Sequence, residues 1–83
     1  MNPPIISREL VESKYSSIQK ATVSDITELI IGPKHKNKRR TWLNTRRAVA
    51  RTSNSLMKWG ILDRESNGNG TYVYKLKGDE KHG

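Results

Sequence analysis

Residues 41–60 constrain the fold of this chain more than any other segment, because their apolar and charged side chains separate at the spacing of an α-helix. With about 100° of rotation per residue, mainly apolar and small polar side chains gather in one direction and mainly cationic side chains in the opposite one. The first group is Trp42, Thr45, Val49, Thr52, Ser53, Leu56 and Gly60, and the second is Arg47, Arg51, Asn54 and Lys58. We therefore predict a long helix that packs through one side and presents charge on the other.

The spacing changes after residue 60 from helical periodicity to alternation. Residues 61–65 and 71–76 each have the pattern of a strand, and residues 66–70 between them contain two Asn-Gly pairs. Asn and Gly accept the positive φ angles that tight hairpin turns require. The sequence therefore predicts a β-hairpin directly after the long helix.

The first of two shorter helices is predicted to begin at Ser7, whose hydroxyl suits the N-cap position. This helix is expected to run to about residue 19. Its apolar face would be formed by Ile6, Leu10, Tyr15 and Ile18. Residues 21–23 are predicted to follow as a short strand.

The second helix is predicted to start at Ser24 or Asp25, because Glu28 lies three residues after Asp25 and completes a capping-box pattern. Its buried face is expected to consist of Ile26, Leu29 and Ile30. Gly32-Pro33 is predicted to end it, because proline cannot continue a helix and glycine favours the position after one. Nine residues then lie between residues 31 and 41. Either the long helix begins earlier, or a basic loop connects the two helices.

The positive charge of the chain is concentrated in its middle. Residues 32–62 hold nine Lys and Arg residues and no Asp or Glu, whereas the other 52 residues hold seven basic and eight acidic ones. The net charge of +8 therefore arises from this one segment. A field concentrated in this way attracts polyanions, and the alternative interpretation is a charged face that is only solvated.

With 83 residues, the chain has room for one domain, which we place at residues 1–77, followed by a disordered polar tail at residues 78–83. It contains no cysteine, and its two histidines, His35 and His82, lack further ligands at metal spacing. We expect no metal, no cofactor, no small-molecule ligand and no enzymatic activity, because the sequence holds no recognisable catalytic constellation. Neither a signal peptide nor a membrane span is evident. We therefore expect a complete small soluble protein that is cytoplasmic, or nuclear in a eukaryote.

The order of these elements resembles that of winged-helix DNA-binding proteins, which add a β-hairpin wing to a helix-turn-helix. Residues 21–30, ATVSDITELI, are similar to the strand and second helix of such proteins. Residues 51–65, RTSNSLMKWGILDRE, are similar to the end of the recognition helix and its turn into the wing. The pattern is shared by MarR-like, ArsR-like and many viral or plasmid-encoded regulators. The resemblance implies an α+β winged helix with three helices, a short strand and a C-terminal two-stranded wing.

The resemblance also implies a function, which is sequence-specific binding of double-stranded DNA by a small transcriptional regulator associated with the nucleoid or with host-cell DNA. A homodimer is a further expectation, because such regulators usually bind paired half-sites.

Candidate contact residues follow from the chemistry of their side chains: Arg reads guanine edges, Asn reads adenine and Lys neutralises phosphate. On the long helix they are Arg46, Arg47, Arg51, Asn54 and Lys58, with Asn44, Thr45 and Ser55 as secondary contacts. Phosphate contacts are expected from Lys34, Lys36, Lys38, Arg39 and Arg40, and wing contacts from Asn67, Asn69 and Lys75.

Other interpretations stay open. The chain is alternatively a non-specific architectural DNA- or RNA-binding protein, which needs only cations, or a winged-helix module that binds proteins. Residues 33–40 also resemble a nuclear localisation signal. Aromatic side chains can stack on bases, but we expect Trp42 and Trp59 to pack in the core, and Tyr72 and Tyr74 to cover the inner face of the hairpin.

Overall fold

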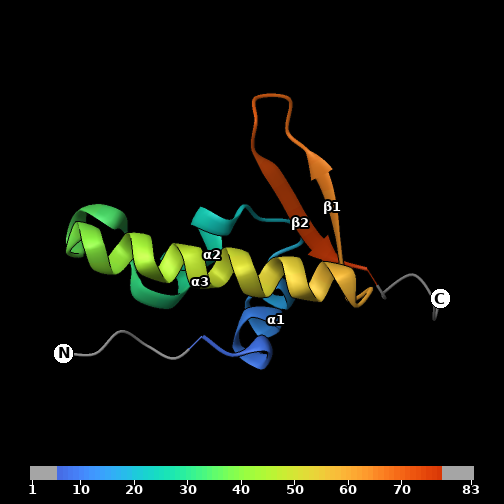
Figure 1. Ribbon diagram of the computed structural model, residues 1–83, viewed down its shortest axis with the longest axis horizontal. Helices are drawn as coiled ribbons and strands as arrows, with labels where there is room; N and C mark the ends of the chain where they lie inside the picture. Colours follow the sequence, from blue (N-terminus) through green and yellow to red (C-terminus); the bar gives the residue numbers. More distant parts are fainter. Residues whose placement is uncertain (1–5, 78–83) are drawn as a thin grey trace.

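Three helices precede a hairpin, in the order that the sequence predicts (Figure 1). The computed structural model describes residues 6–77, so the expected tail at residues 78–83 lies outside the described residues. The elements are α1 (Arg8–Ser17), α2 (Val23–Ile31), the 3-10 turn η1 (Lys34–Lys36), α3 (Arg39–Lys58), β1 (Leu62–Ser66) and β2 (Tyr72–Leu76). The described chain is therefore α+β, with three α-helices and one two-stranded antiparallel sheet.

Ser7 caps α1 as predicted, because its Oγ accepts a hydrogen bond of 3.1 Å from the backbone N–H of Leu10. The helix ends two residues earlier than expected, since Ile18 adopts extended backbone angles (φ −134°, ψ 145°). The buried residues of α1 are Val11 and Tyr15. The predicted apolar face contained Tyr15 but missed Val11, which lies one turn before it.

A capping box starts α2, but its residues differ from the predicted ones. The hydroxyl of Thr22 accepts a hydrogen bond from the backbone N–H of Asp25, and the Asp25 carboxylate accepts one from the N–H of Thr22, both at 3.1 Å. The predicted cap, Ser24 or Asp25, was wrong because Asp25 fills the third helical position. Glu28 lies further along the helix and is exposed.

The strand predicted at residues 21–23 is reduced to one antiparallel bridge. Ala21 and Tyr74 exchange two backbone hydrogen bonds of 3.0 and 2.9 Å. The next residues, beginning with the cap Thr22, already belong to the start of α2. This bridge joins the chain between α1 and α2 to the hairpin.

The face that α2 buries also differs from the predicted one. Val23, Ile26 and Thr27 are buried, at the i, i+3, i+4 spacing of one helix face. Leu29 was expected in the core, but it lies well off this face and keeps 46% of its surface exposed. The Thr27 hydroxyl donates to the carbonyl oxygen of Val23 at 2.9 Å, so the buried oxygen is satisfied within the helix.

The connection between α2 and α3 is ordered by backbone-directed hydrogen bonds. Gly32, with φ 91°, ends α2 as predicted. The Asn37 amide then donates to the carbonyl oxygens of Ile31 and Pro33, at 3.0 and 2.8 Å. The helix α3 begins at Arg39. The long helix therefore begins two residues before position 41, and a basic connection over residues 32–38 still separates it from α2.

A Schellman motif ends α3 and turns the chain into the hairpin. The N–H of Ile61 donates to the carbonyl oxygen of Leu56 at 2.9 Å, and the N–H of Gly60 donates to that of Met57 at 3.1 Å. Gly60 has φ 81°, a conformation that strains residues with a Cβ atom. Glycine at this position therefore has a local structural reason.

The predicted hairpin is confirmed, with β1 and β2 paired antiparallel. Its loop is closed by the N–H of Asn67, which donates to the carbonyl oxygen of Thr71 at 2.8 Å. Within the two Asn-Gly pairs, only Gly68 and Gly70 take positive φ angles, of 90° and 87°. The tip of the hairpin projects beyond the helices (Figure 1).

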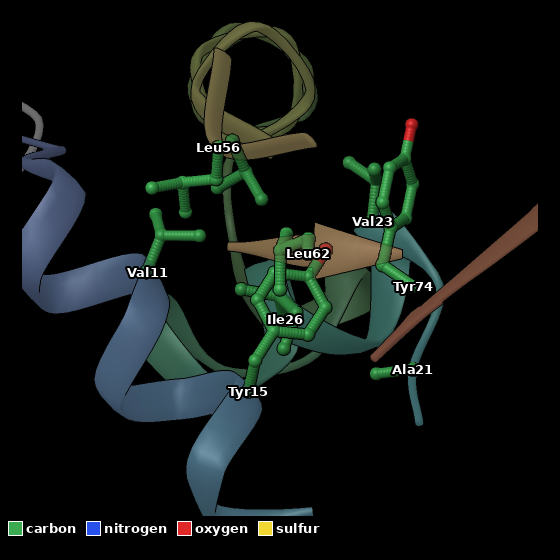
Figure 2. Close-up of a cluster of buried hydrophobic side chains, with 9 residues drawn as sticks. Val11, Tyr15, Ala21, Val23, Ile26, Leu56, Leu62 and Tyr74 are labelled. Atoms are coloured by element: carbon green, nitrogen blue, oxygen red, sulfur yellow. The ribbon is translucent and has the colours of Figure 1, made fainter. Parts of the chain in front are cut away.

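The core lies where α1, α2, the C-terminal half of α3 and the base of the hairpin meet (Figure 2). Its buried members are Val11, Tyr15, Ala21, Val23, Ile26, Val49, Leu56, Leu62 and Tyr74. Trp42 is also buried, as expected, and its indole N–H donates to the carbonyl oxygen of Gly32 at 3.3 Å. The end of α2 is thereby tied to the start of α3.

One hydrogen-bonded polar pair lies inside this core. The hydroxyls of Tyr15 and Ser53 are 2.9 Å apart, and both side chains are buried. Burial raises the pKa of the Tyr15 phenol to about 12, although the hydrogen bond with Ser53 lowers it in part. Among residues 6–77, no buried side-chain nitrogen or oxygen lacks a hydrogen bond.

The arrangement is compatible with the winged-helix layout that the sequence suggests. The helices α2 and α3 pack against each other, α1 packs on both, and the hairpin follows α3 directly. No helix in the described part of the chain is both long and apolar enough to cross a membrane.

Candidate nucleic-acid interface

The outward side of α3 carries one row of exposed cationic and amide side chains. Alternating steps of four and three residues keep the row within about 40° of one direction. We call this row the α3 stripe; its members are Arg40, Asn44, Arg47, Arg51, Asn54 and Lys58. With a rise of 1.5 Å per residue, it is about 27 Å long. Every member of the stripe was among the predicted contact residues.

A second group of cations lies at the N-terminal end of the stripe. We call it the basic connector; it consists of Lys34, Lys36, Lys38 and Arg39, all exposed. The ammonium group of Lys34 is 5.6 Å from the centroid of the Trp42 ring, within the range of a cation–π contact. Because α3 begins at Arg39, the predicted loop residue Arg40 joins the helical stripe, and the connector leads directly into it.

The cations of the stripe and the connector have no acidic partners within the described residues. One ion pair occurs between residues 6 and 77, and it joins Lys20 to Glu65 at 3.6 Å, away from both groups. Intramolecular pairing therefore does not neutralise the charge concentrated in the middle of the sequence. An extended, uncompensated row of cations produces the positive field that polyanions follow.

Three predicted contact residues of α3 do not belong to its outward row. Thr45 is 3% exposed and donates its hydroxyl to the carbonyl oxygen of Thr41 at 2.9 Å, so its prediction as a contact was wrong. Arg46 is half-buried, and its Nε donates to the Ser24 hydroxyl at 2.9 Å, which braces α3 against α2. Ser55 is also half-buried and lies beside the stripe. Thr45 and Arg46 lie at angular positions closer to the packed side of the helix, whereas Ser55 lies about 60° from the stripe.

Asn54 joins the stripe to the hairpin. Its Oδ1 accepts hydrogen bonds from the Tyr74 hydroxyl at 3.1 Å and from Arg64 Nη1 at 3.4 Å. Reading adenine through two hydrogen bonds needs both the oxygen and the nitrogen of an asparagine amide. Because the oxygen is already engaged, the arrangement conflicts with the predicted adenine contact and makes Asn54 a brace between α3 and β2.

The hairpin presents an arginine stacked on a tyrosine. The guanidinium of Arg64 lies over the Tyr72 ring, 4.1 Å from its centroid. Tyr72 and Tyr74 share a strand face, as predicted, but Tyr74 is 4% exposed and Tyr72 is 46% exposed. The difference arises because Tyr72 lies nearer the tip, where the hairpin has passed beyond the core. The predicted wing residues Asn67, Asn69 and Lys75 are exposed.

Trp59 was expected in the core, and this expectation was wrong. It forms the C-cap of α3 and leaves 59% of its surface exposed. The Arg8 guanidinium, from the first turn of α1, lies over its ring at 4.1 Å from the centroid. Trp42 occupies the packed side of the helix, whereas Trp59 lies about 80° away from the centre of that side.

Sequence reasoning missed Arg8 and Arg64 as candidate contacts, because both lie outside the basic segment. In the observed hairpin register, Arg64 pairs with Tyr74 and has Tyr72 as a diagonal neighbour. Arg8 and Trp59 are 51 positions apart in the sequence, and no local pattern links them. In the described residues, no three His, Cys, Asp or Glu side chains gather where they could hold a metal ion.

Comparison with protein-family models, with curated proteins and with solved structures gives no match.

Proposed function

We propose that the protein binds double-stranded DNA as a winged-helix transcriptional regulator, with α3 as the recognition helix. The single observation that supports this proposal is the α3 stripe: four cations and two amides in one exposed row, in which no cation is ion-paired to a carboxylate of the described chain. The major groove is about 12 Å wide and admits an α-helix. The order of helices and hairpin and the bridge between Ala21 and Tyr74 agree with a winged-helix fold.

The position along the stripe decides what each residue contacts. A straight helix and a curved groove approach each other most closely in the middle of the helix, so the central residues reach the base edges. Arg47 and Arg51 are central, and arginine recognises guanine through two hydrogen bonds. Arg40 and Lys58 lie at the ends of the stripe and bind phosphates.

The segments that flank α3 supply further backbone contacts. The basic connector places four cations at the N-terminal end of the stripe. The hairpin lies on the side of α3 where Asn54 accepts a hydrogen bond from Tyr74. Its exposed residues Asn67, Asn69 and Lys75 extend the proposed DNA-binding surface. These contacts set the orientation of the protein on the duplex without reading sequence.

The test is a salt titration combined with selection of bound sequences from a random duplex pool. Neutralising about six phosphates produces a slope near −5 in a plot of log affinity against log salt. We expect this slope together with enrichment of one motif, and a homodimer predicts that the motif has two related halves. The variant Arg47→Ala is expected to weaken binding to the selected motif more than binding to random DNA. Weak, salt-insensitive binding to every duplex would contradict the proposal and favour a protein partner.

Non-specific binding is the second candidate, and the engagement of Asn54 favours it. With Asn54 Oδ1 used within the protein, base reading depends on Arg47, Arg51 and Asn44. Competition with random DNA separates the two candidates, because specific binders exceed their own non-specific affinity by about 10³ or more. A steep salt slope without enrichment of any motif would identify an architectural binder.

A further inference from the structure

A groove runs beside the α3 stripe, between the start of α1 and the C-terminal half of α3. It has a volume of about 440 Å³. Its lining includes Arg8, Arg51, Thr52, Ser55 and Trp59. Because Arg51 belongs to the stripe as well as to this lining, the groove is continuous with the proposed DNA-binding surface.

Trp59 holds the side chain of Arg8 in place. The guanidinium carbon is 4.1 Å from the centroid of the Trp59 ring, a distance at which a cation–π contact forms. Stacking uses the flat face of the guanidinium and leaves the N–H donors in its plane for a ligand. It also restricts the side chain before binding, so less conformational entropy is lost when a ligand arrives.

The remaining donors of the groove suit an anion. Arg51 adds a second guanidinium, and Thr52 and Ser55 add hydroxyl groups on the same side of α3. Neither arginine is ion-paired to a carboxylate within residues 6–77. Guanidinium groups and hydroxyls are the donors that bind phosphate oxygens in protein–DNA complexes.

The groove lies on the side of α3 that faces away from the hairpin. Asn54 contacts the hairpin on one side of the stripe, whereas Thr52, Ser55 and Trp59 lie about 60° to 120° from the stripe on the other side. A helix in the major groove has one DNA strand on each side. The hairpin therefore flanks one strand, and the Arg8 groove flanks the other.

We infer that the Arg8 groove binds a backbone phosphate of the DNA strand on the α1 side of α3, an inference that rests on the proposed function. Arg8 supplies the principal charge, Trp59 positions it, and Arg51 links the phosphate contact to the stripe. A second copy of the chain is a poorer occupant, because Arg8 and Arg51 of both copies would repel. A base stacked on Trp59 is also a poorer one, because Arg8 already covers a face of its ring.

The variant Arg8→Gln tests the inference, with Lys14→Gln as the matched control. Both changes remove one positive charge from α1, but Lys14 does not line the groove. Losing one phosphate contact makes the log–log salt slope shallower by about 0.9, which corresponds to about eightfold weaker binding at 0.1 M salt. We expect this change for Arg8→Gln on both selected and random duplexes, and little change for Lys14→Gln.

The variant Trp59→Leu tests the positioning role separately. We expect a smaller loss of affinity in the wild-type background and almost none in the Arg8→Gln background, because the ring acts through Arg8. Thermal unfolding of each variant verifies that the fold is retained, which the exposure of Trp59 favours. Replacing single phosphates of the selected duplex by uncharged methylphosphonates identifies the contact: one substitution should weaken the wild type but not Arg8→Gln.

The outcomes separate this inference from the proposed function. If the wild type binds duplexes with a steep salt slope while Arg8→Gln behaves like Lys14→Gln, the groove is no phosphate site and the DNA-binding proposal stands. If the wild type binds no duplex, both are overturned. Equal effects of Trp59→Leu in the two backgrounds would contradict the positioning role of the ring.

Discussion

The two sides of α3 differ in where their polar groups find partners. On the packed side, Thr45 and Ser53 bond to Thr41 and Tyr15 within the protein. On the outward side, the cations of the α3 stripe have no carboxylate partner in the described chain. The polar groups of the packed side therefore find their hydrogen-bond partners when the protein folds. The cations of the outward side remain without carboxylate partners in the described chain. This difference is the physical reason for assigning binding to the stripe and stability to the core.

Leu56→Ala tests the packed side and should have the largest effect. Leu56 is 1% exposed and belongs to the core cluster on the packed side of α3. Truncating a buried leucine leaves a cavity and costs about 2 to 5 kcal/mol, a large fraction of the stability of a domain of this size. Chemical denaturation measures the loss. A change below about 1 kcal/mol would show that this side is less tightly packed than the structure indicates.

High pH tests the buried polar pair and should have the next largest effect. The pKa of Tyr15 is 10.0 as a reference and about 12 in the folded protein. Between these values the unfolded chain loses a proton that the folded protein retains, so the free energy of unfolding falls as pH rises. The loss from this group is about 2 to 3 kcal/mol, and it is absent below about pH 10. Denaturation between pH 9 and 12 measures it.

The variant Tyr15→Phe is the control for this titration, because it removes the phenol and retains the ring. Only the difference between the wild-type and variant curves therefore reports on Tyr15. Parallel curves for the two proteins would contradict the prediction.

Asn54→Ala tests the boundary between the two sides and should have an intermediate effect. It removes the acceptor for the hydroxyl of Tyr74 and for Arg64, which costs about 1 kcal/mol. Asn44→Ala is the matched control, since Asn44 is an exposed asparagine of the same helix and both variants gain the same helix propensity. Chemical denaturation of both variants measures how much the hydrogen bonds of Asn54 contribute to the free energy of unfolding. Equal stabilities would mean that Asn54 is available for base contacts.

The double variant Arg40→Ala/Arg47→Ala tests the outward side and should have the smallest effect on stability. Both residues are exposed members of the stripe, so the free energy of unfolding should change by less than about 0.5 kcal/mol. Its DNA affinity should nevertheless fall, with a salt slope shallower by about 0.9, because of the two residues only Arg40 is assigned to a phosphate. Denaturation and a salt titration check the two expectations. A marked loss of stability would show that the stripe contributes to folding.

The sequence predicted those features that depend on neighbouring residues. The Ser7 cap, the end of α2 at Gly32 and the hairpin with its glycine-containing loop are confirmed. Each depends on the chemistry of residues that are close in the chain. The cap of α2 was wrong because Thr22 and Asp25 form the same reciprocal pattern as the predicted pair, three residues earlier.

The residues of the candidate site also divide into those that local spacing identifies and those whose roles depend on distant segments. Helical spacing places Arg47, Arg51, Asn54 and Lys58 in one row, as the sequence predicted, whereas Arg40 joined the row only because α3 begins at Arg39. Thr45 was misassigned as a contact although its own angular position indicates burial. The bracing roles of Arg46 and Asn54 could not be found from helical spacing, because their hydrogen-bond partners Ser24 and Tyr74 come from distant segments.

The sequence by itself determined the amphipathic helix, the hairpin and the concentration of positive charge, because periodicity, turn chemistry and composition are local properties. Only the tertiary structure decided that Trp59, unlike Trp42, is exposed and lies under Arg8. It also decided that Asn54 braces the hairpin and that Arg64 stacks on Tyr72. These outcomes depend on which elements approach one another. That approach is set by burial of the shared core and is not encoded in the spacing of any single segment.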